Sequence, residues 1–299
     1  MNKKSYLENT DVNGFVSYVV DCIKEKKQVN HQYEIVWARW KKYHRENFLS
    51  SSSNIWQVNT LREAFEKYYW PPGSYQNNLV EIPNFDNFQD IHEEYKPLYL
   101  FHTSVDILSW GNVVSKGSVN WLLKAQKENL LEAYINDAVA VLLGENEEEV
   151  LEAFKQGGKF LMNSGTTKIF SFYSKGLSII YDGRVGASIG LLVKNYLIQN
   201  NYEILPEELA FMWGADQGNT GKRNPSDGQF IFPELKSGQK NNSALHALMN
   251  LRANWILEAA ISECDESDWL MWGANNAGEF MRMVEAALFM LGADVSFKK

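Results

Sequence analysis

Residues 164–200, SGTTKIFSFYSKGLSIIYDGRVGASIGLLVKNYLIQN, decide the expected fold because they predict a short helix, a tight break and a second helix. Gly176 suits the left-handed residue that ends a helix, and Asp182 suits the cap that begins the next one. Apolar side chains recur at helical spacing on both sides of this break: they are Ile169, Phe170, Phe172 and Tyr173 before it, and Val185, Ile189, Leu192, Val193 and Tyr196 after it.

The segment 179–185, IIYDGRV, resembles the core of the helix-hairpin-helix DNA glycosylases, in which a loop leads to an aspartate, one or two small or polar residues and a valine that enters a helix. The resemblance covers residues 164–200 and implies an all-α fold with a DNA-binding cleft between two helical lobes. It also implies that Asp182 is catalytic and that the partner is double-stranded DNA with a flipped, damaged or modified base. A looser resemblance is to bacterial phage-defence glycosylases that remove bulky modified cytosines, so both DNA repair and antiviral defence are open.

One stretch departs from the family pattern, and one position distinguishes between the two reaction types within the family. The family usually carries a Gly-hydrophobic-Gly turn before the second helix, whereas residues 158–164 read GKFLMNS, which leaves open how the hairpin grips phosphate. Ser164 stands where lyase-type members carry a nucleophilic lysine, so the resemblance implies a monofunctional enzyme that leaves an abasic site uncut. Lys168 lies about one turn away from that register, and we expect it to contact phosphate instead.

Asp182 has two compatible interpretations. Most aspartates at a helix start only accept hydrogen bonds from the first-turn amides. A carboxylate has two oxygens, however, so one can cap the helix while the other faces a substrate. Capping favours the ionised form, and a stable anion can stabilise an oxocarbenium-like transition state at the deoxyribose C1′.

Composition limits the class of protein. The chain has 299 residues, of which 45% are hydrophobic and 22% charged, as in an ordinary globular protein of one two-lobed domain or two small domains. The absence of a long apolar run and of an apolar signal segment predicts a cytoplasmic protein that does not enter a membrane. Cys22 and Cys264 are expected to be reduced thiols. Metal-ligand spacing is absent, and the expected reaction requires no metal or organic cofactor.

Charge is unevenly distributed along the chain. The formal net charge of −8 argues against binding nucleic acid over the whole surface. Between residues 155 and 200, however, a single acid, Asp182, stands among six cations: Lys155, Lys159, Lys168, Lys175, Arg184 and Lys194. This segment predicts a local basic face that meets phosphates, and the alternative is that these side chains only solvate helix surfaces.

Helical periodicity dominates the rest of the chain. An amphipathic stripe, Tyr33, Val36, Trp37, Trp40 and His44, predicts one helix, and another is predicted over residues 61–68. Residues 71–97 and 214–243 are expected to be long connections. Further helices are expected near 118–127, 128–143, 146–156, 166–174, 183–199, 244–263 and 276–291. We therefore expect one all-α globular unit, 1–299, with lobes formed by 1–97 plus 200–299 and by 98–199.

Several other residues are candidates for contact with DNA or base, each with a structural alternative. Arg184 could hold a phosphate or a substrate carbonyl, or be a solvated side chain. The aromatic and basic run 37–45 more often indicates core packing than stacking on nucleic acid. The complete set of DNA-contact candidates is Ser164, Lys168, Lys175, Arg184, Trp110, Asn112, Lys222, Arg223 and Asn224. No obligatory protein partner is inferred. The main rival interpretation is a non-catalytic helical module that binds DNA or protein.

Overall fold

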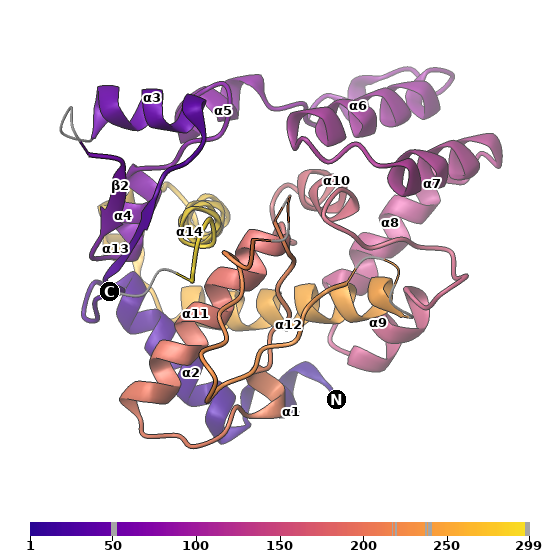
Figure 1. Ribbon diagram of the computed structural model, residues 1–299. Coiled ribbons are helices and arrows are strands. Elements are labelled where there is room, and N and C mark those ends of the chain that lie inside the picture. Colours follow the sequence, from indigo (N-terminus) through magenta and orange to yellow (C-terminus); the bar gives the residue numbers. More distant parts are fainter. Residues whose placement is uncertain (49–52, 217, 219, 237, 239–240, 297–299) are drawn as a thin grey trace. The chain divides into compact units, whose positions relative to one another are not determined.

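The computed structural model describes residues 1–48, 53–216, 218, 220–236, 238 and 241–296 (Figure 1). Fourteen α-helices, two short 3-10 helices and one two-stranded antiparallel sheet form the regular structure of these described residues. The chain is therefore predominantly helical, as its periodicity predicted.

The chain divides into two compact units. The central unit comprises Met1–Tyr6, Ile82–Asp182 and Leu235–Trp255, and the terminal unit comprises Leu7–Glu81, Gly183–Glu234 and Ile256–Lys299. The boundary within the decisive segment thus falls between Asp182 and Gly183. The sequence expectation placed all of 98–199 in one lobe, whereas the helix after Asp182 belongs to the terminal unit.

Six helices and part of a seventh build most of the central unit. Helix α10 packs against α6 and α8, and α6 and α8 also contact each other. Asn146 caps α9, whose first turn holds three glutamates, as expected for a helix start. The elements are α1 (Lys3–Leu7, ending in the terminal unit), η1 (Phe88–Asp90), α6 (Lys96–Trp110), α7 (Lys116–Lys127), α8 (Leu131–Leu142), α9 (Glu147–Ala153), α10 (Thr166–Tyr173) and the first part of α12 (Asn242–Ser262).

The terminal unit is built around helix α14, which packs against α4 and α11. Its sheet pairs β1 with β2 in a register that sets His31 opposite Val58. Its other elements are α2 (Thr10–Ile23), β1 (His31–Glu34), α3 (Ala38–Asn47), β2 (Ile55–Val58), α4 (Leu61–Glu66), α5 (Tyr75–Glu81), α11 (Gly183–Gln199), η2 (Glu207–Leu209), the end of α12, α13 (Glu266–Trp272) and α14 (Ala277–Leu291).

The predicted helical stripe that begins at Tyr33 is wrong in its first half. Tyr33 lies in β1, where its ring stacks on Trp56 of β2 at a centroid distance of 4.7 Å. Helix α3 begins only at Ala38, and it buries Trp40 and His44 as the core interpretation predicted. The long connection expected over 71–97 contains α5 and η1, whereas 214–241 has no helix or strand among its described residues.

Candidate functional site

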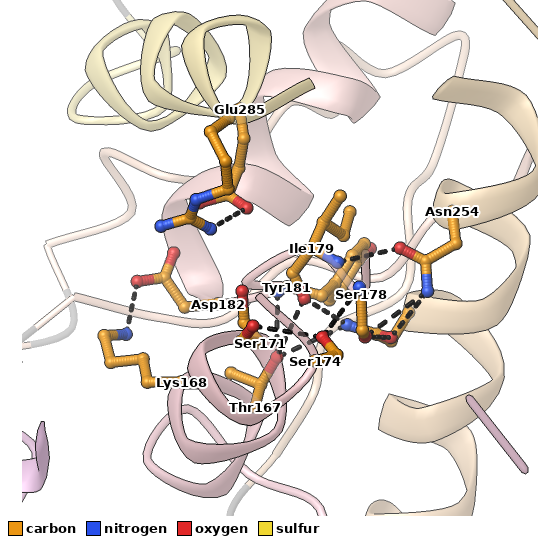
Figure 2. Close-up of polar contacts among 12 residues, drawn as sticks. Thr167, Lys168, Ser171, Ser174, Ser178, Ile179, Tyr181, Asp182, Asn254 and Glu285 are labelled. Carbon is orange, nitrogen blue, oxygen red and sulfur yellow. Dashed lines mark hydrogen bonds and ion pairs between the residues drawn. The ribbon is translucent and has the colours of Figure 1, made fainter. Parts of the chain in front are cut away.

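Asp182 is the last residue of the loop that follows α10, and α11 begins at the next residue. Its side chain is 12% exposed, and its Oδ2 lies 3.1 Å from the Nζ of Lys168, whose side chain is 5% exposed. Figure 2 shows the two side chains pointing toward each other. The Lys168 Nζ also donates a hydrogen bond to the Ser164 carbonyl at 3.0 Å. A buried carboxylate and a buried ammonium are therefore in direct contact within the central unit.

Gly111 makes room for the lysine. A Cβ built on Gly111 would lie 2.6 Å from the Cδ of Lys168 and 2.9 Å from its Cε, which is too close for carbon atoms in contact. Gly111 follows the end of α6, so a residue without a side chain at that point lets the aliphatic stem of Lys168 pass. Gly111, between the DNA-contact candidates Trp110 and Asn112, thus accommodates the side chain of Lys168.

A row of polar side chains on α12 holds the loop that ends in Asp182. His246, Asn250 and Asn254 are spaced by four residues and so share one helix face. The Asn254 Oδ1 accepts a hydrogen bond from the Ile179 amide at 2.9 Å (Figure 2). The Asn250 Nδ2 donates to the Ile179 carbonyl at 2.8 Å. The His246 Nε2 lies 2.5 Å from the Tyr181 carbonyl. Three side chains thus bind the loop by its backbone.

Helix α10 fixes the same loop from its other side. The Thr167 Oγ1 accepts a hydrogen bond from the Tyr181 amide at 3.0 Å, and the Ser174 Oγ accepts one from the Ser178 amide at 3.0 Å. The chain leaves α10 through Lys175 and Gly176, at φ of 54° and 82°. Gly176 therefore adopts the left-handed conformation that the sequence predicted at the helix end. All these partners are buried, so the loop has little freedom to move Asp182.

His246 carries a proton on Nε2, because a carbonyl oxygen can only accept the hydrogen bond. Burial lowers the pKa of His246 to about 4, while the nearby charges of Asp182 and Lys168 act on it in opposite directions. The imidazole is therefore neutral near pH 7 and donates to Tyr181 in one fixed tautomer.

The structure corrects the expectation that Lys168 contacts phosphate. This lysine is only 4% exposed and is paired with the Asp182 carboxylate, so it is not available to a phosphate at the surface. The side chain that caps α10 is Asn163, whose Oδ1 accepts from the amides of Gly165 and Thr166. Ser164 contributes its carbonyl instead.

The other candidates of the central unit lie in different surroundings. Trp110 is half-buried and packs edge-on against Phe172, with ring centroids 5.3 Å apart. Asn112 is exposed at a φ of 50°, and Lys175 is exposed.

Arg184, in the terminal unit, is buried among aromatic rings. It is 7% exposed, so the solvated interpretation is wrong. Its guanidinium carbon lies 4.4 to 5.6 Å from the centroids of four rings: Phe289, Trp40, Trp37 and Trp70. Gly292 packs on its backbone so closely that a Cβ there would lie 1.8 Å from the Arg184 carbonyl oxygen. Cation–π contacts and this close packing anchor the first turn of α11.

The basic loop candidates have local partners. The Lys222 Nζ lies 3.6 Å from the Asp294 carboxylate, and the Arg223 Nη1 donates to the Ala215 carbonyl at 3.5 Å. Asn224 accepts from the Ser226 amide at 3.0 Å, as in a polar turn.

The six cations of the predicted basic face divide between the units. Lys155, Lys159, Lys168 and Lys175 lie in the central unit, and Arg184 and Lys194 lie in the terminal unit. Lys168 and Arg184 are buried, so the predicted face is wrong for two of its members.

The sequence reasoning missed the residues that hold the loop: Thr167, His246, Asn250 and Asn254. A signal for three of them was present, since His246, Asn250 and Asn254 form a polar row at four-residue spacing on one helix. Among the described residues, no group of three or more His, Cys, Asp or Glu side chains is arranged to hold a metal ion. None of the described helices combines the length and apolarity that crossing a membrane requires. The chain matches no protein family, no curated protein and no solved structure.

Proposed function

We propose that this protein is a DNA glycosylase that hydrolyses the N-glycosidic bond of a flipped, damaged or modified base and leaves an abasic site. The observation that carries the proposal is the Asp182 carboxylate, which is buried, ion-paired with Lys168 and fixed by a loop bonded to two helices. An acid held in one place by several buried contacts is suited to preorganised electrostatic catalysis.

In this reaction Asp182 stabilises the positive charge that develops on the deoxyribose ring as the base departs. It also orients or deprotonates the water that replaces the base. A flipped nucleotide is needed, since the bond to C1′ is inaccessible inside a duplex. The hydrogen bonds from Asn250 and His246 to the Ile179 and Tyr181 carbonyls keep the carboxylate from moving toward solvent. Lys168 fixes the position of the Asp182 Oδ2 atom, and its positive charge offsets the desolvation cost of the buried carboxylate.

We propose that base release is hydrolytic. Lys168 donates hydrogen bonds to two oxygens, those of Ser164 and Asp182, as an ammonium group does. An ammonium has no lone pair with which to attack C1′, whereas a neutral amine could form an imine there. Ser164 offers no amine in its place.

The rival proposal is a helical DNA-binding module in which the Asp182–Lys168 pair only stabilises the fold. Duplex and phage genomic DNAs that carry different modified bases would be incubated with the protein, and released free base would be measured by mass spectrometry. Base release by the wild type, lost in Asp182→Asn but kept in Asp137→Asn, supports the glycosylase. Asp137 is a matched control because it is an exposed aspartate of the same unit. DNA binding without release of any base supports the module.

A further inference from the structure

Helix α7 is a concentration of positive charge on an acidic protein. Its sequence, KGSVNWLLKAQK, holds three lysines and no acid, although the whole chain has a formal net charge of −8. Lys116, Lys124 and Lys127 are all exposed. The acid closest in sequence is Glu128, at the C-cap. Favourable interaction with the helix dipole does not explain all three lysines, because Lys116 stands in the first turn, where a cation is unfavourable.

These lysines lie on the side of α7 that faces away from its packing. Ser118, Leu122 and Ala125 are the buried residues, and they mark one side of the helix. At 100° per residue, Lys116 and Lys127 fall almost opposite that side, and Lys124 lies next to them. Lys116 and Lys127 are 11 positions apart, or about 16 Å along the axis. One strand of B-DNA rises about 3.4 Å per phosphate along the duplex axis, so a row aligned with that axis covers the rise of about five phosphates.

A second segment adds to this row. The indole Nε1 of Trp121, on α7, donates a hydrogen bond to the carbonyl of Lys159 at 2.9 Å. The exposed Lys159 therefore lies beside α7, although it is distant in sequence. Trp121 is half-buried, with its ring edge-on to Phe170, so the core holds this junction in place. We call Lys116, Lys124, Lys127 and Lys159 the α7 patch.

We propose that the α7 patch binds the phosphate backbone of duplex DNA. The inference rests on the proposed function, and it moves the main DNA contact from the predicted face over 155–200 to a helix that the sequence reasoning did not single out. On a protein of net negative charge, three exposed lysines on one helix that holds no acid, with a fourth exposed lysine beside it, form a surface where the repulsion of phosphates is reduced. Such contacts are independent of base sequence and position the duplex, while the Asp182 site selects the base.

The test uses the full chain and a fluorescently labelled, unmodified 25-base-pair duplex, with affinity measured by anisotropy from low to moderate salt. The patch variant is Lys116→Gln/Lys124→Gln/Lys127→Gln. The control is Lys4→Gln/Lys26→Gln/Lys42→Gln, which removes the same charge from three exposed lysines on separate segments. Each phosphate contact contributes about 0.9 to the slope of log K against log salt, so the patch variant should reduce the slope by about 2 to 3. The control should change the slope by less than about 1.

Equal weakening by the two triple variants would overturn the proposal, since only net charge would then matter. Failure of the wild type to bind duplex DNA at low salt would overturn it too, as would equally tight binding of polyglutamate of matched charge. The result is separable from the catalytic proposal, because Asp182→Asn should bind this duplex like the wild type. A patch-dependent salt slope without any base release would retain the α7 patch and reject the glycosylase.

Discussion

The contact between Lys168 and Asp182 predicts strong thermodynamic coupling between the two residues. Their side chains are 5% and 12% exposed, and the joined atoms are 3.1 Å apart. Removing one partner of a buried ion pair costs about 3 to 5 kcal/mol, because a buried charge is left without its counter-charge. In Asp182→Asn the amide oxygen can still accept from Lys168, so we expect a loss of about 2 to 4 kcal/mol in the free energy of unfolding.

Lys168→Met should cost about 3 kcal/mol, because the carboxylate loses its ammonium. The double variant buries neither charge and should be less destabilised than the sum of the two single variants by about 2 to 3 kcal/mol. For a chain of this size, 3 kcal/mol corresponds to about 6 °C in Tm. Urea denaturation followed by circular dichroism and fluorescence measures all four proteins of the cycle. Additive effects, with a coupling below about 0.5 kcal/mol, would refute a buried, paired Asp182.

Three further predictions concern the chemistry and packing around this pair. Borohydride added to the protein with abasic-site DNA should trap no covalent complex, and strands should break only after alkali; an adduct mapped to Lys168 would contradict the hydrolytic proposal. Gly111→Ala should destabilise the chain by about 1 to 3 kcal/mol in thermal denaturation, because the new methyl group displaces the aliphatic stem of Lys168. Gly117→Ala is the control and should be neutral or stabilising, because a Cβ there would meet only the Ser115 Oγ at 3.9 Å. Burial lowers the pKa values of His31, His44 and His246 to about 4, so the unfolded chain takes up these protons first as pH falls below about 6.5. The free energy of unfolding, measured between pH 7 and 4.5, should therefore fall by up to about 1.4 kcal/mol per pH unit for each histidine. A stability that does not change with pH would contradict the buried neutral state of these histidines.

Helix positions were largely readable from the sequence. The expected helix over 183–199 is α11, Gly183–Gln199, and that over 118–127 is α7, Lys116–Lys127. Apolar side chains at helical spacing and polar caps act within one or two turns, so local pattern was sufficient. Tyr33 also fitted a helical spacing, yet it pairs in a strand with residues of 55–58. Strand pairing depends on a partner that is distant in sequence, and the spacing of neighbouring residues does not identify that partner.

The sequence by itself determined a helical chain and a carboxylate placed directly before a helix. Only the tertiary structure decided the surroundings of that carboxylate. Lys168 reaches Asp182 because Gly111 of another segment leaves room for it, and the loop is held by Asn250 and Asn254, about seventy positions away in sequence. Periodicity gives the face of a helix on which a side chain lies. Burial and ion pairing depend on which segments meet in space, and those contacts are set by the packing of the whole unit.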